Sequence, residues 1–238
     1  MREAGRLAAS VLKTLCDEIR PGVSTAELDV LAGDVMKAHG VRSAFLGYNG
    51  YPAQTCISVN DTVIHGIPSP RTIKDGDIVS LDVGVWFEGF VGDNARTIPV
   101  NVSDPETLML LRETENALHA GIAAAKPGAR LGDVSHAIEI VANKAKLGIV
   151  REFVGHGCGR ILHEEPQIPN YGSSGRGPVL KEGMVLCLEP MFNLGTRRVK
   201  TLSDGWTVVT ADGKPSAHFE HEIAITANGA EILTAPGN

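Results

Sequence analysis

The chain has 238 residues, of which 43% are hydrophobic and 21% are charged, and its formal net charge is −6. This balance is typical of a folded globular protein with one large hydrophobic core, and it excludes a disordered chain. The acidic net charge and the absence of a Lys/Arg run argue against nucleic-acid specificity. No apolar stretch reaches the roughly 20 residues that span a bilayer, so we expect no membrane partner.

The cysteines indicate the compartment. The chain has four cysteines, and no two of them form a CxxC pair: Cys16, Cys56, Cys158 and Cys187. This pattern favours free thiols in a reducing compartment over a disulfide framework or a structural zinc site. The first ten residues also carry charges and lack the apolar core of a secretory signal. We therefore expect a cytoplasmic protein.

The first forty residues predict two helices. Apolar side chains recur at helical spacing from Leu7 to Ile19, and Pro21-Gly22 ends this helix. Ser24, with Glu27 three residues later, has the pattern of a capping box and begins the second helix, which ends at Gly40.

The same order of features returns about 107 residues further on. Glu106 to about Lys126 predicts a helix that ends at Pro127-Gly128, and a further helix ends at Gly148. The stretch 74–82 (KDGDIVSLD) matches 181–189 (KEGMVLCLE). Three matches in one order at nearly one spacing indicate an internal duplication.

Short apolar runs predict the strands. Ile78–Val85 and Val185–Leu188 are rich in β-branched and apolar residues. Trp206–Thr210 and His218–Thr226 flank Asp212-Gly213, which predicts a hairpin between these two segments.

Strands joined by hairpins favour a mostly antiparallel sheet with helices on one side. We therefore predict an α+β fold with a single domain, residues 1–238. Its duplicated halves, roughly 1–104 and 105–238, would be related by a pseudo-two-fold axis.

Four acidic residues form the first functional signal. The duplication places Asp82 and Glu189 at equivalent strand ends, so the pseudo-two-fold axis would bring these carboxylates together. A hairpin across Gly84–Gly92 would return Asp93 next to Asp82, and Glu220 follows Glu189 by thirty-one residues. Carboxylates that lie close together repel unless a cation or a proton lies between them.

Histidines complete the predicted site. His156 lies between two glycines, which let backbone and substrate approach its ring, and it precedes His163; His65 lies in the stretch VIHGIP. Four carboxylates with one imidazole suit Mn²⁺, Fe²⁺ or Co²⁺, with Zn²⁺ as an alternative. Two metals about 3.5–4 Å apart activate a water and stabilise a tetrahedral intermediate. The residues alone therefore indicate a dinuclear metallohydrolase.

These residues resemble the type 1 methionine aminopeptidases of bacteria, which share the pita-bread fold with creatinase and Xaa-Pro aminopeptidase. The resemblance covers essentially the whole chain. It rests on motifs in the family's order: Gly47–Pro52 (GYNGYP), Cys56–Asn60 (CISVN), His65–Pro68 (HGIP), Asp82 with Asp93, Gly155–Arg160 (GHGCGR), His163–Pro166 (HEEP), Glu189–Met191 (EPM) and Glu220-His221 (EH).

The resemblance implies a curved sheet covered by helices and a site for two divalent metal ions. Asp93 and Glu220 are the implied bridging carboxylates, and Glu189 is the implied proton acceptor from the attacking water. His65 and His163 are the implied substrate contacts, near the scissile amide and its carbonyl. The full set of implied ligands is Asp82, Asp93, His156, Glu189 and Glu220.

The implied reaction removes the N-terminal methionine of nascent polypeptides when the second residue is small. The implied partners are nascent chains at the ribosome exit, and the family precedent is a monomer. Aromatic, apolar and sulfur-containing side chains are expected around the methionine: Phe45, Tyr48, Tyr51, Cys56, Leu162, Met191 and Trp206.

Two positions depart from the family pattern. Asn49 stands where many relatives have His, and Asn94 follows Asp93 where Ser or Thr is common. Because Asn94 adjoins an implied ligand, the surroundings of that carboxylate are expected to differ.

Two other functions stay open at this point. A Xaa-Pro aminopeptidase or dipeptidase has the same fold, but such enzymes usually carry a separate N-terminal domain, whereas this chain starts directly in the catalytic unit. A peptide- or RNA-binding relative without metals would be expected to lack several ligands, whereas all five are present here.

Overall fold

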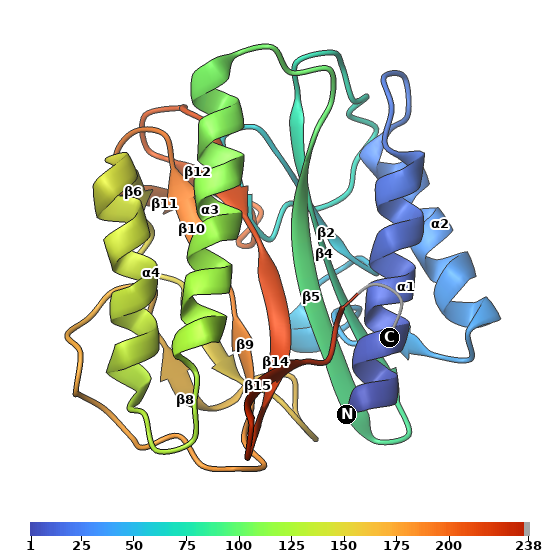
Figure 1. Cartoon of the computed structure of the whole chain (residues 1–238). Helices are drawn as coiled ribbons and strands as arrows, with labels where there is room; N and C mark the ends of the chain where they lie inside the picture. Colours follow the sequence, from blue (N-terminus) through green and yellow to red (C-terminus); the bar gives the residue numbers. More distant parts are fainter. Residues whose placement is uncertain (236–238) are drawn as a thin grey trace.

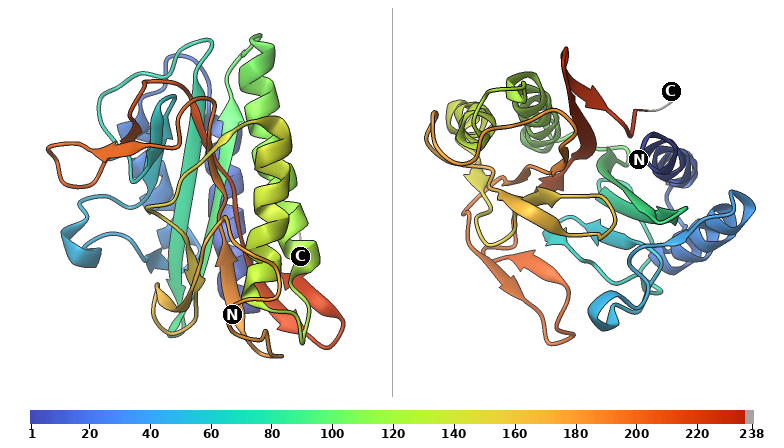
Figure 2. Two further views of the ribbon diagram at one scale, coloured as in Figure 1. Left: turned by 90° about the vertical axis from the view of Figure 1, so that its left-hand side faces the viewer. Right: turned by 90° about the horizontal axis from the view of Figure 1, so that it is seen from below.

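A computed structural model describes residues 1–235, in which four α-helices cover the outer face of a curved sheet (Figure 1). Viewed from below, the two helix pairs follow one another around the outside of the curve (Figure 2). The helices are α1 (Arg2–Glu18), α2 (Thr25–Ala38), α3 (Pro105–Ala124) and α4 (Leu131–Ala145). All four predicted helices are confirmed.

Local signals account for the helix boundaries. The backbone N–H of Glu27 donates to Ser24 Oγ at 3.2 Å, and Glu27 Oε2 accepts from the Ser24 backbone N–H at 2.8 Å, so the predicted capping box of α2 is present. At the start of α3, Asp104 Oδ2 accepts from the backbone N–H of Thr107 at 2.8 Å. Both caps bond amide groups that would otherwise lack partners in the first helical turn.

The main sheet has nine strands, and all its strand pairs are antiparallel, which confirms the predicted α+β class. Its order is β1-β4-β5-β14-β9-β7-β8, with β2 on β4 and β15 on β14. The bounds are β1 (Arg42–Ser43), β2 (Cys56–Val59), β4 (Ile78–Phe87), β5 (Phe90–Pro99), β7 (Gly155–Gly157), β8 (Glu164–Ile168), β9 (Val185–Leu188), β14 (Glu220–Thr226) and β15 (Gly229–Ile232).

Two small sheets and one short 3₁₀ helix complete the part of the chain that the structure describes. One small sheet has the strand order β13-β10-β6, and the other has the order β11-β12-β3. The elements are β3 (Thr62–Ile64), η1 (Tyr48–Gly50), β6 (Gly148–Ile149), β10 (Met191–Asn193), β11 (Val199–Thr201), β12 (Val208–Thr210) and β13 (Ser216–His218).

The predicted hairpin between Trp206–Thr210 and His218–Thr226 is wrong. β12 pairs with β11 on one edge and with β3 on the other, so both of its edges are occupied. Asp212 Oδ2 accepts from the backbone N–H of Thr196 at 2.7 Å, and Asp212 Oδ1 accepts from that of Lys214 at 3.2 Å. The Asp212-Gly213 turn therefore leads the chain from one small sheet to the other.

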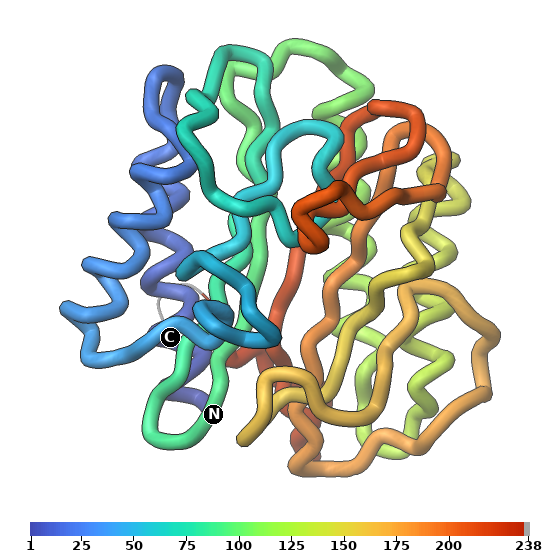
Figure 3. The backbone as a smooth tube through the Cα atoms, turned by 180° about the vertical axis from the view of Figure 1, so that it is seen from behind, coloured from blue at the N-terminus to red at the C-terminus, as the bar shows by residue number. Residues whose placement is uncertain are grey.

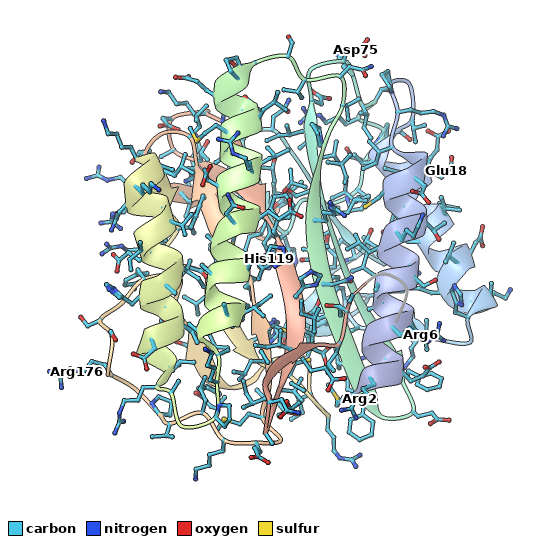
Figure 4. All side chains as sticks on the ribbon, viewed as in Figure 1. Arg2, Arg6, Glu18, Asp75, His119 and Arg176 are labelled. Carbon is cyan, nitrogen blue, oxygen red and sulfur yellow. The ribbon has the colours of Figure 1, made fainter. Side chains whose placement is uncertain are left out.

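Two apolar clusters hold the helices on the sheet. Leu15 and Val83 belong to the cluster beneath α1 and α2, and Leu110 and Phe192 belong to the cluster beneath α3 and α4; all four side chains are at most 1% exposed. Polar residues such as Arg6 and Glu18 lie on the outer side of α1 (Figure 4). Within residues 1–235, no helix combines the length and apolar character needed to cross a membrane.

The face opposite the helices is formed by loops and short strands. Seen from behind, segments near residues 50, 160 and 205 surround the middle of this face (Figure 3). These segments come from distant parts of the sequence, and each carries residues of the predicted site.

Candidate active site

Strand pairing brings the predicted metal ligands together. Asp82 on β4 lies opposite Ala95 on β5, and Ala95 lies opposite Glu220 on β14. Residues directly opposite one another in a sheet share a face, and so do residues two apart on one strand. Asp93 is therefore on the same face as Asp82 and Glu220, as a diagonal neighbour of both.

The remaining two ligands come from the other half of the sheet. His156 on β7 lies opposite Cys187 on β9, and Glu189 is two residues beyond Cys187. His156 Nε2 lies 3.5 Å from Glu189 Oε1 and 3.9 Å from Asp93 Oδ2. One possible ligand atom from each of four buried side chains lies within 4.8 Å of all the others: Asp93, His156, Cys187 and Glu220.

Three carboxylates of this cluster each have one oxygen without a hydrogen-bond partner. Asp82 Oδ1, Asp93 Oδ1 and Glu220 Oε1 are buried and accept no hydrogen bond within the described chain. Burial raises the pKa of Asp93 to about 7, and burial followed by repulsion from Asp93 raises the pKa of Asp82 and of Glu220 well above their ordinary values. Burial, followed by repulsion from Asp82 and Asp93, also raises the pKa of Glu189 well above its ordinary value.

These observations fit divalent metal binding. Unpaired buried carboxylates need either protons or cations, and oxygen-rich sets with one imidazole bind transition metals. His156 Nδ1 is 2.9 Å from the carbonyl oxygen of Gly157, which leaves Nε2 toward the carboxylates. Burial lowers the pKa of His156 to about 4, so its ring is neutral at pH 7, as metal ligation requires.

Glycines on both sides of His156 allow close strand packing. A Cβ at Gly155 would lie 2.3 Å from the carbonyl oxygen of Cys187, and a Cβ at Gly157 would lie 2.3 Å from that of Glu165. Only glycine lets both neighbouring strands approach the histidine at this distance.

A cavity of about 270 Å³ opens directly onto the carboxylate cluster. It is lined by the five predicted metal ligands, by both predicted substrate histidines, by most of the predicted methionine pocket and by Asn49: Phe45, Tyr48, Asn49, Tyr51, Cys56, His65, Asp82, Asp93, His156, Leu162, His163, Glu189, Trp206 and Glu220. Gly84 makes room for the Phe45 ring, because a Cβ there would lie 2.4 Å from Phe45 Cε1.

Met191 does not line this cavity, contrary to its predicted place in the methionine pocket. It is fully buried in a separate apolar cluster with Val63, Ile64, Val150 and Val208. The reason is the path of the chain after Glu189. Met191 begins β10, which leaves the main sheet and pairs with β13 and β6.

The two predicted substrate histidines occupy different surroundings. His65 has a left-handed backbone (φ 57°), and its ring stands edge-on to the rings of Phe153 and Trp206. Burial, followed by electrostatic repulsion from His163, lowers the pKa of His65 to about 4. The His163 ring stands edge-on to His156, with 4.4 Å between ring centroids, and partial burial lowers its pKa. Its Nδ1 lies 2.7 Å from the Tyr48 hydroxyl.

Sequence reasoning missed three buried residues around the ligands. His218 Nε2 lies 3.8 Å from Glu189 Oε2, and Glu222 Oε2 accepts from the backbone N–H of Asp93 at 3.0 Å. Cys187 is fully buried, and burial raises its thiol pKa well above the ordinary value. The missed signal was strand alternation, since each of these residues lies two positions from a predicted ligand along the chain.

Comparison with known proteins agrees with this geometry. The model of metallopeptidase family M24 matches residues 1–227. Methionine aminopeptidase 1 of Bacillus subtilis is 53% identical over 235 residues, which are 98% of this chain and 94% of the relative. The crystal structure of methionine aminopeptidase from Thermotoga maritima has a TM-score of 0.97 at 47% identity, covering 98% of this chain and 94% of that chain.

A second branch of the fold is more distant. Prolidase from Pyrococcus furiosus has a TM-score of 0.79 at 25% identity, and the match covers 100% of this chain and 63% of the prolidase. The predicted family and its pita-bread fold are thereby confirmed. The chain belongs to metallopeptidase family M24 and, within it, to the methionine aminopeptidases of the bacterial type.

Proposed function

We propose that this protein is a metal-dependent aminopeptidase that removes N-terminal methionine. One observation carries the proposal: a single cavity joins a cluster of buried carboxylates, three of which have an oxygen without a hydrogen-bond partner, to a largely apolar pocket of aromatic and sulfur-containing side chains. Such a cavity holds an apolar side chain beside a hydrolytic centre. The high identity to methionine aminopeptidases over nearly the whole chain supports the same function.

Two divalent metals are proposed for the cluster, Mn²⁺, Fe²⁺ or Co²⁺, with Zn²⁺ as an alternative. When bound, such a pair polarises the scissile carbonyl and supplies an activated water. Asp93 and Glu220 would serve both ions, because each offers a ligand atom to the group whose members all lie within 4.8 Å of one another. The complete ligand set would be Asp82, Asp93, His156, Glu189 and Glu220.

The protein's own side chains have separate proposed roles. Glu189 accepts the proton of the attacking water, a role that suits a carboxylate in contact with a neutral histidine. His163 lies beside His156 and donates a hydrogen bond to the carbonyl oxygen as negative charge develops. His65, on the Trp206 side of the cavity, contacts the scissile amide.

The substrate's first side chain would occupy the apolar part of the cavity. Cys56 offers a sulfur, Leu162 an aliphatic surface, and Tyr51 and Trp206 stand edge-on to one another at 5.1 Å between centroids. A long unbranched thioether matches this lining by shape and by sulfur–aromatic contact. We propose that the second residue must be small (Gly, Ala, Ser, Thr, Pro, Val or Cys), since a larger one would clash beside the metals.

The proposed setting is the cytoplasm, where a monomeric enzyme acts on nascent polypeptide N-termini at the ribosome exit. Four free cysteines suit a reducing compartment, and three of them are buried. Nascent chains are the source of the N-terminal methionines that such a cavity accepts.

A panel of peptides tests the proposal against the Xaa-Pro alternative. We expect Met-Gly-Met to be cleaved far faster than Leu-Gly-Met, Met-Lys-Met or Met-Phe-Met. Equal rates on Leu-Gly-Met and Met-Gly-Met would refute the methionine pocket, and preferential cleavage of non-methionine Xaa-Pro peptides would favour the prolidase-like function. If the protein binds metal but cleaves none of these peptides, the proposal that it is an aminopeptidase is refuted.

A further inference from the structure

One hydrogen bond joins two residues that are remote in sequence at the edge of the cavity. The Tyr48 hydroxyl lies 2.7 Å from Nδ1 of His163, and the two rings meet edge-on with 5.2 Å between centroids. Tyr48 comes from η1 in the first half of the chain, whereas His163 follows β7 in the second half. The contact therefore fixes a residue of one half against the proposed reaction centre of the other.

The backbone around Tyr48 makes this hydroxyl a fixed partner. The backbone N–H of Tyr48 donates to the carbonyl of Phe45 at 2.9 Å, and that of Tyr51 donates to the carbonyl of Tyr48 at 2.9 Å. Gly47 (φ 83°) and Asn49 (φ 47°) on either side adopt left-handed conformations that close the turn tightly. Tyr48 is thereby held in the cavity wall, half-buried, with its hydroxyl toward His163.

The chemistry of a neutral imidazole gives this contact a direction. A neutral ring carries one N–H donor and one acceptor nitrogen, and the hydrogen bond at one nitrogen selects the tautomer. His163 can stabilise negative charge on a carbonyl oxygen only through an N–H, and Nδ1 is occupied by Tyr48. The productive tautomer therefore has its hydrogen on Nε2, with Nδ1 accepting from the tyrosine hydroxyl.

We propose that Tyr48 is a positioning residue for the reaction, whose hydroxyl holds His163 as the Nε2–H tautomer and aims that N–H into the cavity. The kinetic consequence of this inference rests on the proposed function. The inference gives Tyr48 a role toward His163 in addition to its place in the wall of the methionine pocket. Without the hydroxyl, the Nδ1–H tautomer and rotated rings become populated, so fewer molecules present a donor to the substrate.

Tyr48→Phe tests this role because it removes only the hydroxyl and keeps the ring. We expect kcat for Met-Gly-Met to fall about 10-fold, with KM changed less than about 2-fold, since the lost interaction acts in the transition state. Tyr171→Phe is the matched control, because Tyr171 packs under Arg151 outside the cavity, and it should leave kcat and KM unchanged. A raised KM with unchanged kcat would mean that Tyr48 serves only the pocket, and would overturn the proposal.

A double-mutant cycle separates positioning from general damage to the fold. If Tyr48 acts through His163, Tyr48→Phe should change the residual rate of His163→Ala less than about 2-fold. A further full 10-fold loss in that background would overturn the inference, because it would show that the tyrosine acts independently of the histidine.

The tautomer itself can be observed without any turnover. In Zn²⁺-loaded protein, ¹H–¹⁵N spectra of the histidine rings should show His163 with Nε2 protonated and Nδ1 unprotonated, and Tyr48→Phe should shift it toward a tautomer mixture. A protonated Nδ1 in the wild type would refute the inference. Because this readout needs no substrate, it stands even if the Met-peptide panel refutes the proposed function.

Discussion

Carboxylates at the surface and carboxylates at the centre of this protein have opposite electrostatic surroundings. Asp133, at the start of α4, accepts hydrogen bonds from Ser174 Oγ and from the backbone N–H groups of Gly175 and Arg130, which lower its pKa to about 2. Asp93, at the centre, is 3% exposed, and burial raises its pKa to about 7. The same residue type thus favours a negative charge at one place and a proton at the other.

The difference lies in the donors that the fold provides. Surface acids accept hydrogen bonds from backbone N–H groups, hydroxyls and Arg side chains. Glu231, for example, accepts from Arg2 at 2.7 Å, and Arg2 lies at the edge of the molecule (Figure 4). Within the described chain, the ion-pair contacts to the central acids come from histidines that burial keeps neutral, among them His156 and His218. The central region therefore needs a cation from solution.

The largest effect is expected for Asp93→Ala. We predict loss of turnover together with lower metal content, because a carboxylate at the centre of the cluster compensates both ions. Elemental analysis and a Met-Gly-Met assay on the same sample measure the two quantities. If this variant retained two tightly bound metals and a near-normal rate, Asp93 would not be the bridge.

The next effect separates catalysis from metal binding. His163→Ala should lower kcat by about 10²-fold or more while KM changes little, because a contact to the developing oxyanion acts mainly in the transition state. The metal content of this variant should match that of the wild type, because His163 lines the cavity but is not one of the five proposed ligands. Loss of metal from this variant would make His163 a ligand and contradict its assignment.

A smaller effect concerns the stability of the metal-free protein. Raised carboxyl pKa values mean that the folded state holds protons that the unfolded chain has released, so the free energy of unfolding falls as pH rises, by about 1.4 kcal/mol per pH unit for each retained proton. The buried histidines act in the opposite direction, but only below about pH 6.5, where the unfolded chain becomes protonated.

The useful window is therefore about pH 6.5 to 8. It lies above the range in which the histidines of the unfolded chain titrate, and Glu222, whose pKa burial raises to about 8, keeps its proton in the folded state through most of it. Urea unfolding of chelator-treated protein should show stability decreasing across this window, whereas Mn²⁺-loaded protein should be nearly flat. A metal-free protein whose stability rose with pH here would contradict the raised carboxyl pKa values.

The smallest effect belongs to the surface. Asp104→Ala removes the cap of α3 and should lower the free energy of unfolding slightly, because the backbone N–H of Thr107 loses its partner in the first helical turn. Turnover and metal content should stay at wild-type values, because Asp104 is exposed at the start of α3 and does not line the cavity. A loss of metal from this variant would break the contrast between the two classes of carboxylate.

Features that depend on residues close together in the chain could be predicted from the sequence alone. The Ser24–Glu27 capping box and the return of Asp93 toward Asp82 follow from interactions within a few residues, and both were predictable. The partners of His156 and Glu189 required the internal repeat as well as the resemblance to a family. Because that resemblance implies the ligand set as a whole, all five proposed ligands could be predicted from the sequence.

The failures have a shared physical cause. Trp206–Thr210 looked like one arm of a hairpin, and Met191 like part of the pocket, because sequence spacing does not reveal which sheet a strand joins. Glu222 and His218 were not predicted because strand alternation places them on the same face as Glu220 but does not show which residues they contact across the strands. Pairing between distant segments decides all four cases.

The most direct test of a cation-dependent centre is a metal titration of chelator-treated protein, with bound Mn²⁺ and turnover of Met-Gly-Met measured on the same samples. The structure predicts no turnover without metal and activity that rises as Mn²⁺ fills the site. The wild type should bind two ions per chain, and Asp93→Ala should bind fewer. Full turnover in protein shown to be metal-free, or Mn²⁺ binding unchanged by Asp93→Ala, would contradict this account.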